Sequence, residues 1–322
     1  MTDFEPRRLI KFGNSSFIVS LPKPWVERNN LKKGDWVYLK EGENNEITLL
    51  PKDRHILENE TKITIDISNK GIDDVRREIN SAYINNFKII TMVGKDLQKK
   101  SPEIKEFLQS LTGIEILEQN SKEIVAKDFL NVETIAPKKI MRRVDNIIRS
   151  IFEDIRAGIK DTQFRKGLFD EIMEEDQNIN KLYLLICKLA KLGMNNREIV
   201  KIFDMSYNEL SSAQWLAFNL EYLGDDLKRV ARFLTKTKLT GKQKEYLENT
   251  FDLIEGCFIN AMTAYHKEEP LLAREVLGKK EAVLRELDKM CQGGDDILIG
   301  NIVERLKMVY FHIHNISKLI IY

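Results

Sequence analysis

From Pro137 to Tyr322 the chain has the periodicity of amphipathic helices and no strand signal that survives inspection. One apolar face repeats at intervals of three and four residues between Ile140 and Ile155. Helices of this kind bury their apolar stripes by packing against one another. We therefore predict an all-helical domain over residues 137–322.

Six helices account for this half of the chain. Ser206-x-x-Glu209 and Thr240-x-x-Gln243 are capping boxes that mark the start of two of them. A weak internal repeat in apolar spacing favours two three-helix units packed side by side. The helices are expected at residues 137–158, 163–192, 206–238, 242–267, 270–291 and 296–320.

Residues 1–54 contain short β-branched or aromatic runs separated by turn residues such as Gly13-Asn14-Ser15-Ser16. Pro24 fits the first turn of a short helix at about residues 24–29. Strands this short bury little apolar surface alone, so we expect the segment to need a partner chain. The expected strands are Phe17-Ile18-Val19, Trp36-Val37-Tyr38-Leu39 and Ile47-Thr48-Leu49-Leu50.

Residues 60–135 read as a small α/β module. Ile63, Ile65 and Ile67 alternate as in a half-buried strand, and one helix separates them from a more apolar strand. A second helix is expected after Ser101-Pro102 and is ended by Gly113. The order is therefore βαβαββ, with strands at residues 63–67, 88–93, 114–118 and 123–127.

Composition narrows the class of protein. The 322 residues carry a net charge of +1, so no global field draws the chain to nucleic acid and any such binding needs a local patch. Cys187, Cys257 and Cys291 form no CxxC motif, which favours buried thiols in a reducing cytoplasm. No leader and no apolar run long enough to span a membrane is seen, so we predict a cytoplasmic protein without membrane insertion.

The amino-terminal segment supplies a local patch. Residues 1–33 contain seven Lys and Arg residues and three Asp and Glu residues, which gives a net charge of +4. In a dimer this charge doubles, which is enough to bind phosphates in a salt-dependent manner. Asn14, Ser15 and Ser16 add neutral donors for phosphate or base edges. The alternative is a solvated turn with ordinary surface lysines.

The run K-F-G-N-S-S-F-I-V-S-L-P-K-P-W-V at residues 11–26, followed by L-K-K-G-D-W-V at residues 31–37, resembles the AbrB/MazE/SpoVT swapped-hairpin family. The resemblance covers about residues 5–52. It implies an intertwined homodimer of β-hairpins, a small barrel that binds DNA. The candidate DNA contacts that it implies are Arg7, Arg8, Lys11, Asn14, Ser15, Ser16 and Lys23.

The helical half contains an acidic cluster. Glu221 and Asp225 are four residues apart, so both carboxylates project from one helix face. Facing carboxylates on neighbouring helices make metal sites in bundles, although a solvated acidic stripe is the alternative.

Residues 137–322 resemble the PhoU family, whose members have two three-helix repeats with metal-binding acidic motifs. The motif E-x-x-G-D stands at Glu221 to Asp225, and Asp176 occupies the place of the acid in the preceding helix. The resemblance therefore implies a site for a divalent or ferric ion at Asp176, Glu221 and Asp225. In the second repeat Phe311 replaces the expected aspartate, so no second site is predicted.

The middle module resembles the linker between an AbrB-like head and a PhoU-like tail in archaeal-type phosphate regulators. The sequence has no GxxxxGK[ST], no GxGxxG after a strand, no GxSxG and no HExxH, so we predict that it is not an enzyme. His55 and His266 have no nearby nucleophile in the sequence and are interpreted as surface residues.

Two functions follow from these observations. The first is a multidomain transcription regulator of phosphate uptake and homeostasis, with a dimeric head on DNA and a helical tail as sensor or docking module. The second is an adaptor that does not bind DNA, in which the head only dimerises. Its tail would dock on a phosphate transporter or a phosphate-signalling kinase.

Overall fold

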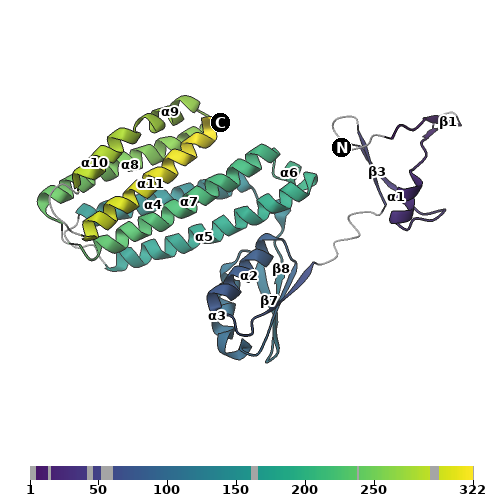
Figure 1. Cartoon of the computed structure of the whole chain (residues 1–322), viewed down its shortest axis with the longest axis horizontal. Coiled ribbons are helices and arrows are strands. Elements are labelled where there is room, and N and C mark those ends of the chain that lie inside the picture. Colours follow the sequence, from purple (N-terminus) through teal and green to yellow (C-terminus); the bar gives the residue numbers. More distant parts are fainter. Residues whose placement is uncertain are drawn as a thin grey trace. The chain divides into compact units, whose positions relative to one another are not determined.

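The computed structural model describes residues 5–13, 16–41, 46–51, 61–160, 166–237, 239–290 and 297–321 (Figure 1). The chain divides into two compact units, Met1–Thr61 and Lys62–Tyr322. We call the first unit the head; the second contains the α/β module and the helical domain. Among the described residues, no helix is both long and apolar enough to cross a membrane.

The head consists of two antiparallel hairpins and one short helix. Strand β1 (Ile10–Phe12) pairs with β2 (Ser16–Ile18), and β3 (Tyr38–Glu41) pairs with β4 (Ile47–Leu50). Helix α1 (Lys23–Arg28) lies between the hairpins in the chain and has proline at its second position. The predicted helix and the strand at 47–50 are confirmed; β1 was not predicted, and β3 begins at Tyr38 rather than at Trp36. The described residues of one chain do not close a barrel, and the two sheets stay separate.

No described residue of the head is buried. In the β1–β2 register Ile10 lies opposite Ile18, so both side chains share one face of the hairpin, yet they are 58% and 44% exposed. An apolar face of this kind is stable in water only when something covers it. Other exposed apolar side chains in the head include Leu9, Phe12, Phe17, Val19, Trp36, Tyr38, Leu39 and Ile47.

The α/β module has the predicted order βαβαββ. Its four strands form one sheet in the order β5-β6-β8-β7, with β5 parallel to β6 and the other pairs antiparallel. The two helices lie together against the sheet, and apolar side chains of both, among them Ile79 and Ile104, join its core (Figure 1). The elements are β5 (Lys62–Asp66), α2 (Ile72–Ile84), β6 (Ile89–Val93), α3 (Leu97–Ser110), β7 (Ile114–Gln119) and β8 (Glu123–Asp128).

Helix α3 begins earlier than its proline suggests. The expected start after Ser101-Pro102 is wrong, because the helix starts at Leu97 and contains Pro102. Leu97 is 1% exposed, so burial of its side chain favours the extra turn. Gly113 lies just after the helix with φ +81°, and a Cβ there would approach Leu130 to 2.9 Å, so the turn requires glycine.

The helical domain contains eight helices in its described part rather than the predicted six. The prediction did not include α6, and the expected helix at 270–291 is interrupted at Lys279. The capping boxes at Ser206 and Thr240 are confirmed. The helices are α4 (Pro137–Lys160), α5 (Lys166–Asn195), α6 (Arg197–Ile202), α7 (Tyr207–Leu234), α8 (Gly241–Lys267), α9 (Pro270–Gly278), α10 (Lys280–Met290) and α11 (Ile297–Ile321).

One apolar core runs through α4, α5 and α7 to α11, while the buried residues of α6 belong to a separate small cluster. The centre of the larger core contains Phe152, whose ring lies 5.3 Å from the rings of both Phe251 and Phe258. Cys187 and Cys257 are free and buried, as predicted, while Cys291 lies outside the described residues. The two expected three-helix units therefore share a continuous interior.

A buried ion pair joins the α/β module to the helical domain. The Nζ of Lys188 on α5 lies 3.1 Å from Asp128 Oδ2, and each side chain is 1% exposed. The same ammonium donates to the carbonyl of Tyr83 at 3.0 Å and lies 4.5 Å from the centre of its ring. Asn86 in turn donates to the carbonyl of Lys188. These contacts fix α5 against the end of α2 and β8.

Candidate functional site

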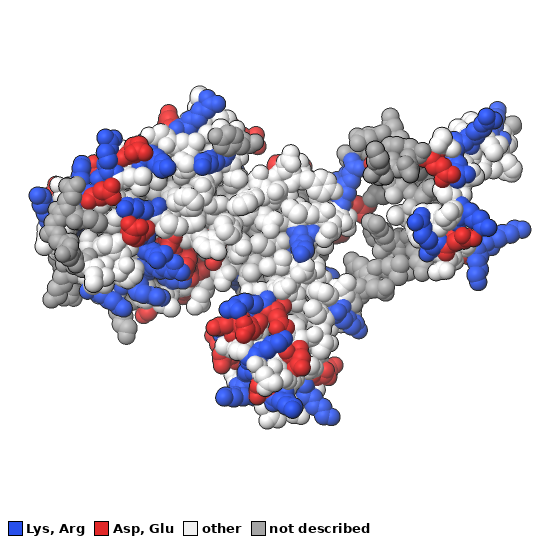
Figure 2. Space-filling view, viewed as in Figure 1, with Lys and Arg blue, Asp and Glu red and all other residues white. Residues whose placement is uncertain are grey.

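The head carries the predicted DNA contacts on its surface. Arg7 and Arg8 precede β1, and Lys11 lies in β1 opposite Phe17. Ser16 begins β2 and Lys23 begins α1; the described candidates are all exposed, while Asn14 and Ser15 lie outside the described residues. Lys and Arg side chains outnumber Asp and Glu on the visible face of this unit (Figure 2).

Two of these bases make local ion pairs. Arg7 contacts Glu5, and Lys23 lies 3.6 Å from Glu27 one helical turn away. The side chains of Lys23 and Glu27 are 86% and 65% exposed, and pairs of this kind contribute about 1 kcal/mol or less. These basic side chains therefore stay available for phosphate groups.

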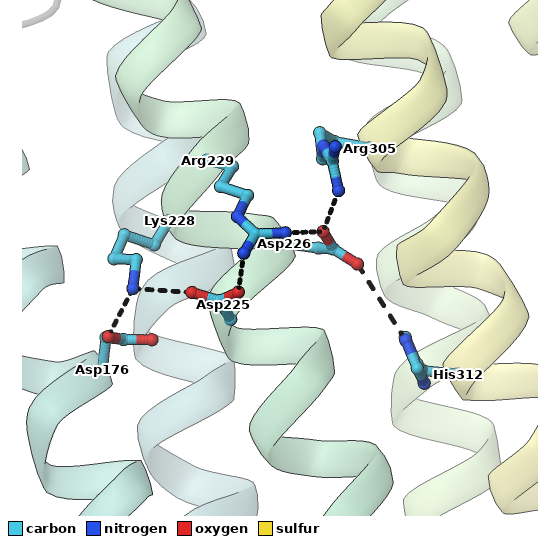
Figure 3. Close-up of polar contacts among 7 residues, drawn as sticks. All are labelled: Asp176, Asp225, Asp226, Lys228, Arg229, Arg305 and His312. Atoms are coloured by element: carbon cyan, nitrogen blue, oxygen red, sulfur yellow. Dashed lines mark hydrogen bonds and ion pairs between the residues drawn. The ribbon is translucent and has the colours of Figure 1, made fainter. Parts of the chain in front are cut away.

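In the helical domain, two of the three predicted metal ligands, Asp176 and Asp225, contact cations of their own chain (Figure 3). Lys228 Nζ lies 2.7 Å from Asp176 Oδ2 and 2.7 Å from Asp225 Oδ1. Arg229 Nη2 lies 2.5 Å from the other oxygen of Asp225. Burial alone would lower the pKa of Lys228, but its hydrogen bonds to both carboxylates outweigh burial and raise it.

This arrangement does not fit a metal ion. An ammonium bridges Asp176 and Asp225, and a metal at that point would displace it from two short ion pairs. Among the described residues, no group of three or more His, Cys, Asp or Glu side chains is placed to hold a metal. The structure thus brings two of the predicted ligands together, but around Lys228.

Glu221 lies close enough to this cluster to feel the charges of both its carboxylates and its cations, which make their own ion pairs with Asp176 and Asp225. Burial is the main cause that raises its pKa to about 7, and the charges of Asp225 and Asp176 add to the effect. In a fraction of the molecules, the Glu221 carboxyl is therefore protonated at neutral pH.

Replacing Glu221 with glutamine is expected to stabilise the helical domain at high pH only. The folded protein holds this proton up to about pH 7, whereas an unfolded glutamate releases it near 4.5, so stability falls as pH rises between these values. After allowance for solvent screening, Glu221→Gln should raise the free energy of unfolding by about 1–2 kcal/mol at high pH and by little in acid. Urea unfolding on either side of this window measures the difference.

Glu304→Gln serves as the matched control, because this glutamate lies on α11 with a side chain 68% exposed. It should shift stability little at either pH. Equal effects of Glu221→Gln above and below the window would contradict the assignment.

On the other side of the cluster, Asp226 is buried against α11. Its Oδ1 lies 3.1 Å from Arg305 Nη1 and 3.4 Å from Arg229 Nη1 (Figure 3). His312 Nε2 is 3.9 Å from Asp226 Oδ2 and has no hydrogen-bond partner in the described residues. Burial lowers the pKa of His312 despite the nearby carboxylate, so the neutral form is favoured and Arg305 is the main partner of Asp226.

The interpretation of His266 as a surface residue is wrong. Its Nε2 lies 3.2 Å from Asp145 Oδ2, and the two side chains are 17% and 7% exposed. Arg149 holds the same carboxylate at 2.7 Å, so the group links α4 to α8. His55 lies outside the described residues.

Comparison with known proteins gives one finding. Residues 10–57 match the family described as antidote-toxin recognition MazE, bacterial antitoxin. The head is thus similar to MazE/AbrB-like domains, in agreement with the resemblance found at these positions. The searches of curated proteins and of solved structures gave no match. The resemblance to PhoU has no support from these comparisons.

Proposed function

We propose that this chain is a homodimeric, DNA-binding transcription regulator. One observation carries the proposal. The part of the chain that matches the MazE family exposes both its apolar strand faces and its Lys and Arg side chains. A second copy would cover the apolar faces and form a shared barrel. The Lys and Arg side chains of both copies would then form one surface for DNA phosphates.

In this arrangement the cations supply affinity and the neutral donors supply contacts that can depend on base sequence. Arg8 and Lys11 are exposed and close in sequence to the turn that joins β1 and β2. The helical domain serves as sensor or docking module. A ligand of that domain that weakens DNA binding must itself bind less tightly when DNA is present.

We include in the proposal a role in phosphate uptake, with a transporter or a phosphate-signalling protein as partner. The only support for this role is the resemblance of the helical half to PhoU. A cytoplasmic location is also part of the proposal, and it rests on the cysteine pattern rather than on this resemblance. A second candidate function is protein binding without DNA, favoured by the description of the matched family as a toxin-recognition domain. The head would then dimerise and present a protein-binding surface.

DNA binding tests the choice between these functions. The double variant Arg8→Ala/Lys11→Ala removes four cations from the dimer. It should lower affinity for a short duplex about 10- to 100-fold and reduce the slope of log affinity against log salt by about 3–4. Fluorescence anisotropy across a salt series measures both quantities.

The control Lys99→Ala/Lys122→Ala removes the same charge from exposed lysines of the α/β module and should leave binding unchanged. Lack of binding by the unmodified chain at about 50 mM salt would favour the protein-binding function. Equal losses in both double variants would show that net charge, rather than the head, is responsible.

A further inference from the structure

A cavity lies between α5 and α7, outside the ion-pair cluster. Its volume is about 280 Å³, and it is lined by Tyr183, Gln214, Trp215 and Phe218. Three of these four side chains are aromatic. Trp215 is 58% exposed, so the cavity opens to solvent beside an indole ring.

The aromatic rings form a continuous wall on α7. The rings of Trp215 and Phe218 meet edge to face with centres 5.8 Å apart, and Phe218 lies 4.5 Å from Tyr222. Residues spaced three and four apart share a helix face, which explains the series. Figure 2 shows a broad, largely uncharged area on the visible face where the first part of α7 and the last part of α5 lie.

One carboxylate stands beside this wall. Glu221 follows Phe218 by three residues and Gln214 by seven, so it lies on the same face of α7. It is close enough to Tyr183 for its charge to add to burial in raising the pKa of that phenol. Lys228 and Arg229 make their ion pairs with Asp176 and Asp225, so their charges offset that of Glu221 only in part.

We propose that this cavity binds a small organic cation of the methylated ammonium class. The faces of aromatic rings attract such cations, and quaternary ammonium groups are bound in cages of two to four rings. Methyl groups replace N–H donors on such an ammonium, so it needs fewer hydrogen-bond acceptors than a free ammonium. The apolar wall can pack against these methyl groups. Glu221, on the same face of α7 as the aromatic wall, supplies the opposite charge and disfavours anions. The proposal is independent of DNA binding by the head.

Choline is the probe, titrated into the full chain in buffer of about pH 8 and followed by ligand-observed NMR. Its neutral isostere, 3,3-dimethylbutan-1-ol, has the same shape without the charge. We expect choline to bind in the millimolar range and the isostere at least about tenfold more weakly. Glycine betaine, which carries its own carboxylate, should also bind more weakly than choline.

Variants locate the site. Trp215→Leu and Glu221→Gln should each weaken choline binding about fivefold. Phe129→Leu is the matched control, because Phe129 is an exposed ring with Lys127 over it on the α/β module, and it should change nothing. Equal affinity for choline and the isostere, an absence of choline binding, or binding unaffected by Trp215→Leu would each overturn the proposal. The isostere comparison needs no variant, so it stands even if a variant fails to fold.

Discussion

Changing Ile10 and Ile18 together to serine is expected to abolish self-association of the chain. The two side chains lie opposite each other on one face of the first hairpin, and neither is buried within one chain. Covering each by a second copy contributes about 1.5–3 kcal/mol, so their loss should raise the dissociation constant at least about a hundredfold. Sedimentation equilibrium of the full chain measures it.

The matched control is Leu271→Ser, which removes a leucine that is 74% exposed on α9. It should leave the dimer intact. Circular dichroism of both variants should report intact helices, because the head and the second unit are separate compact units. A monomeric unmodified chain, or a double variant that stays dimeric, would contradict the shared barrel.

Lys188→Met is expected to cost about 3–5 kcal/mol in the free energy of unfolding. The change leaves the carboxylate of Asp128, which is 1% exposed, without the ammonium 3.1 Å away. The interface between the α/β module and α5 should therefore loosen. Urea unfolding followed by circular dichroism measures the loss, and hydrogen exchange at α2 and α5 locates it.

Lys88 provides the matched control, because it contacts the same carboxylate at 3.4 Å with a side chain 37% exposed. Lys88→Met should cost about 1 kcal/mol or less. Adding Asp128→Leu to Lys188→Met should recover much of the stability, since no buried carboxylate then remains. Equal costs for the two lysine variants would show that the buried pair is not the source.

Regular patterns in the sequence predicted most of the fold. The α/β order and the two capping boxes depend on local periodicity and on side chains three residues apart, so a single sequence contains them. The break at Lys279 was missed because Glu281 and its neighbours continue a helical pattern, although Gly278, where α9 ends, is a residue type that often ends helices. The proposed barrel would need a second chain, and the described residues of one chain form only two separate hairpins.

The candidate sites were less predictable. Lys228 and Arg229 follow Asp225 by three and four residues, so the sequence already contained the signal that this carboxylate is paired. The Asp176 contact depends on how α5 meets α7 and could not be predicted from spacing. Lys188 lies within an otherwise apolar stretch of α5, and this pattern predicts a buried lysine with a charged partner. The pattern alone does not identify Asp128 as that partner.

Native mass spectrometry of the full chain mixed with a short DNA duplex at low salt tests the central claim most directly. It counts the chains in each complex. The account predicts complexes with two chains on one duplex and two chains in the free protein, both lost in Ile10→Ser/Ile18→Ser. Complexes with a single chain, or a dimer that forms no complex with DNA at any salt concentration, would contradict it.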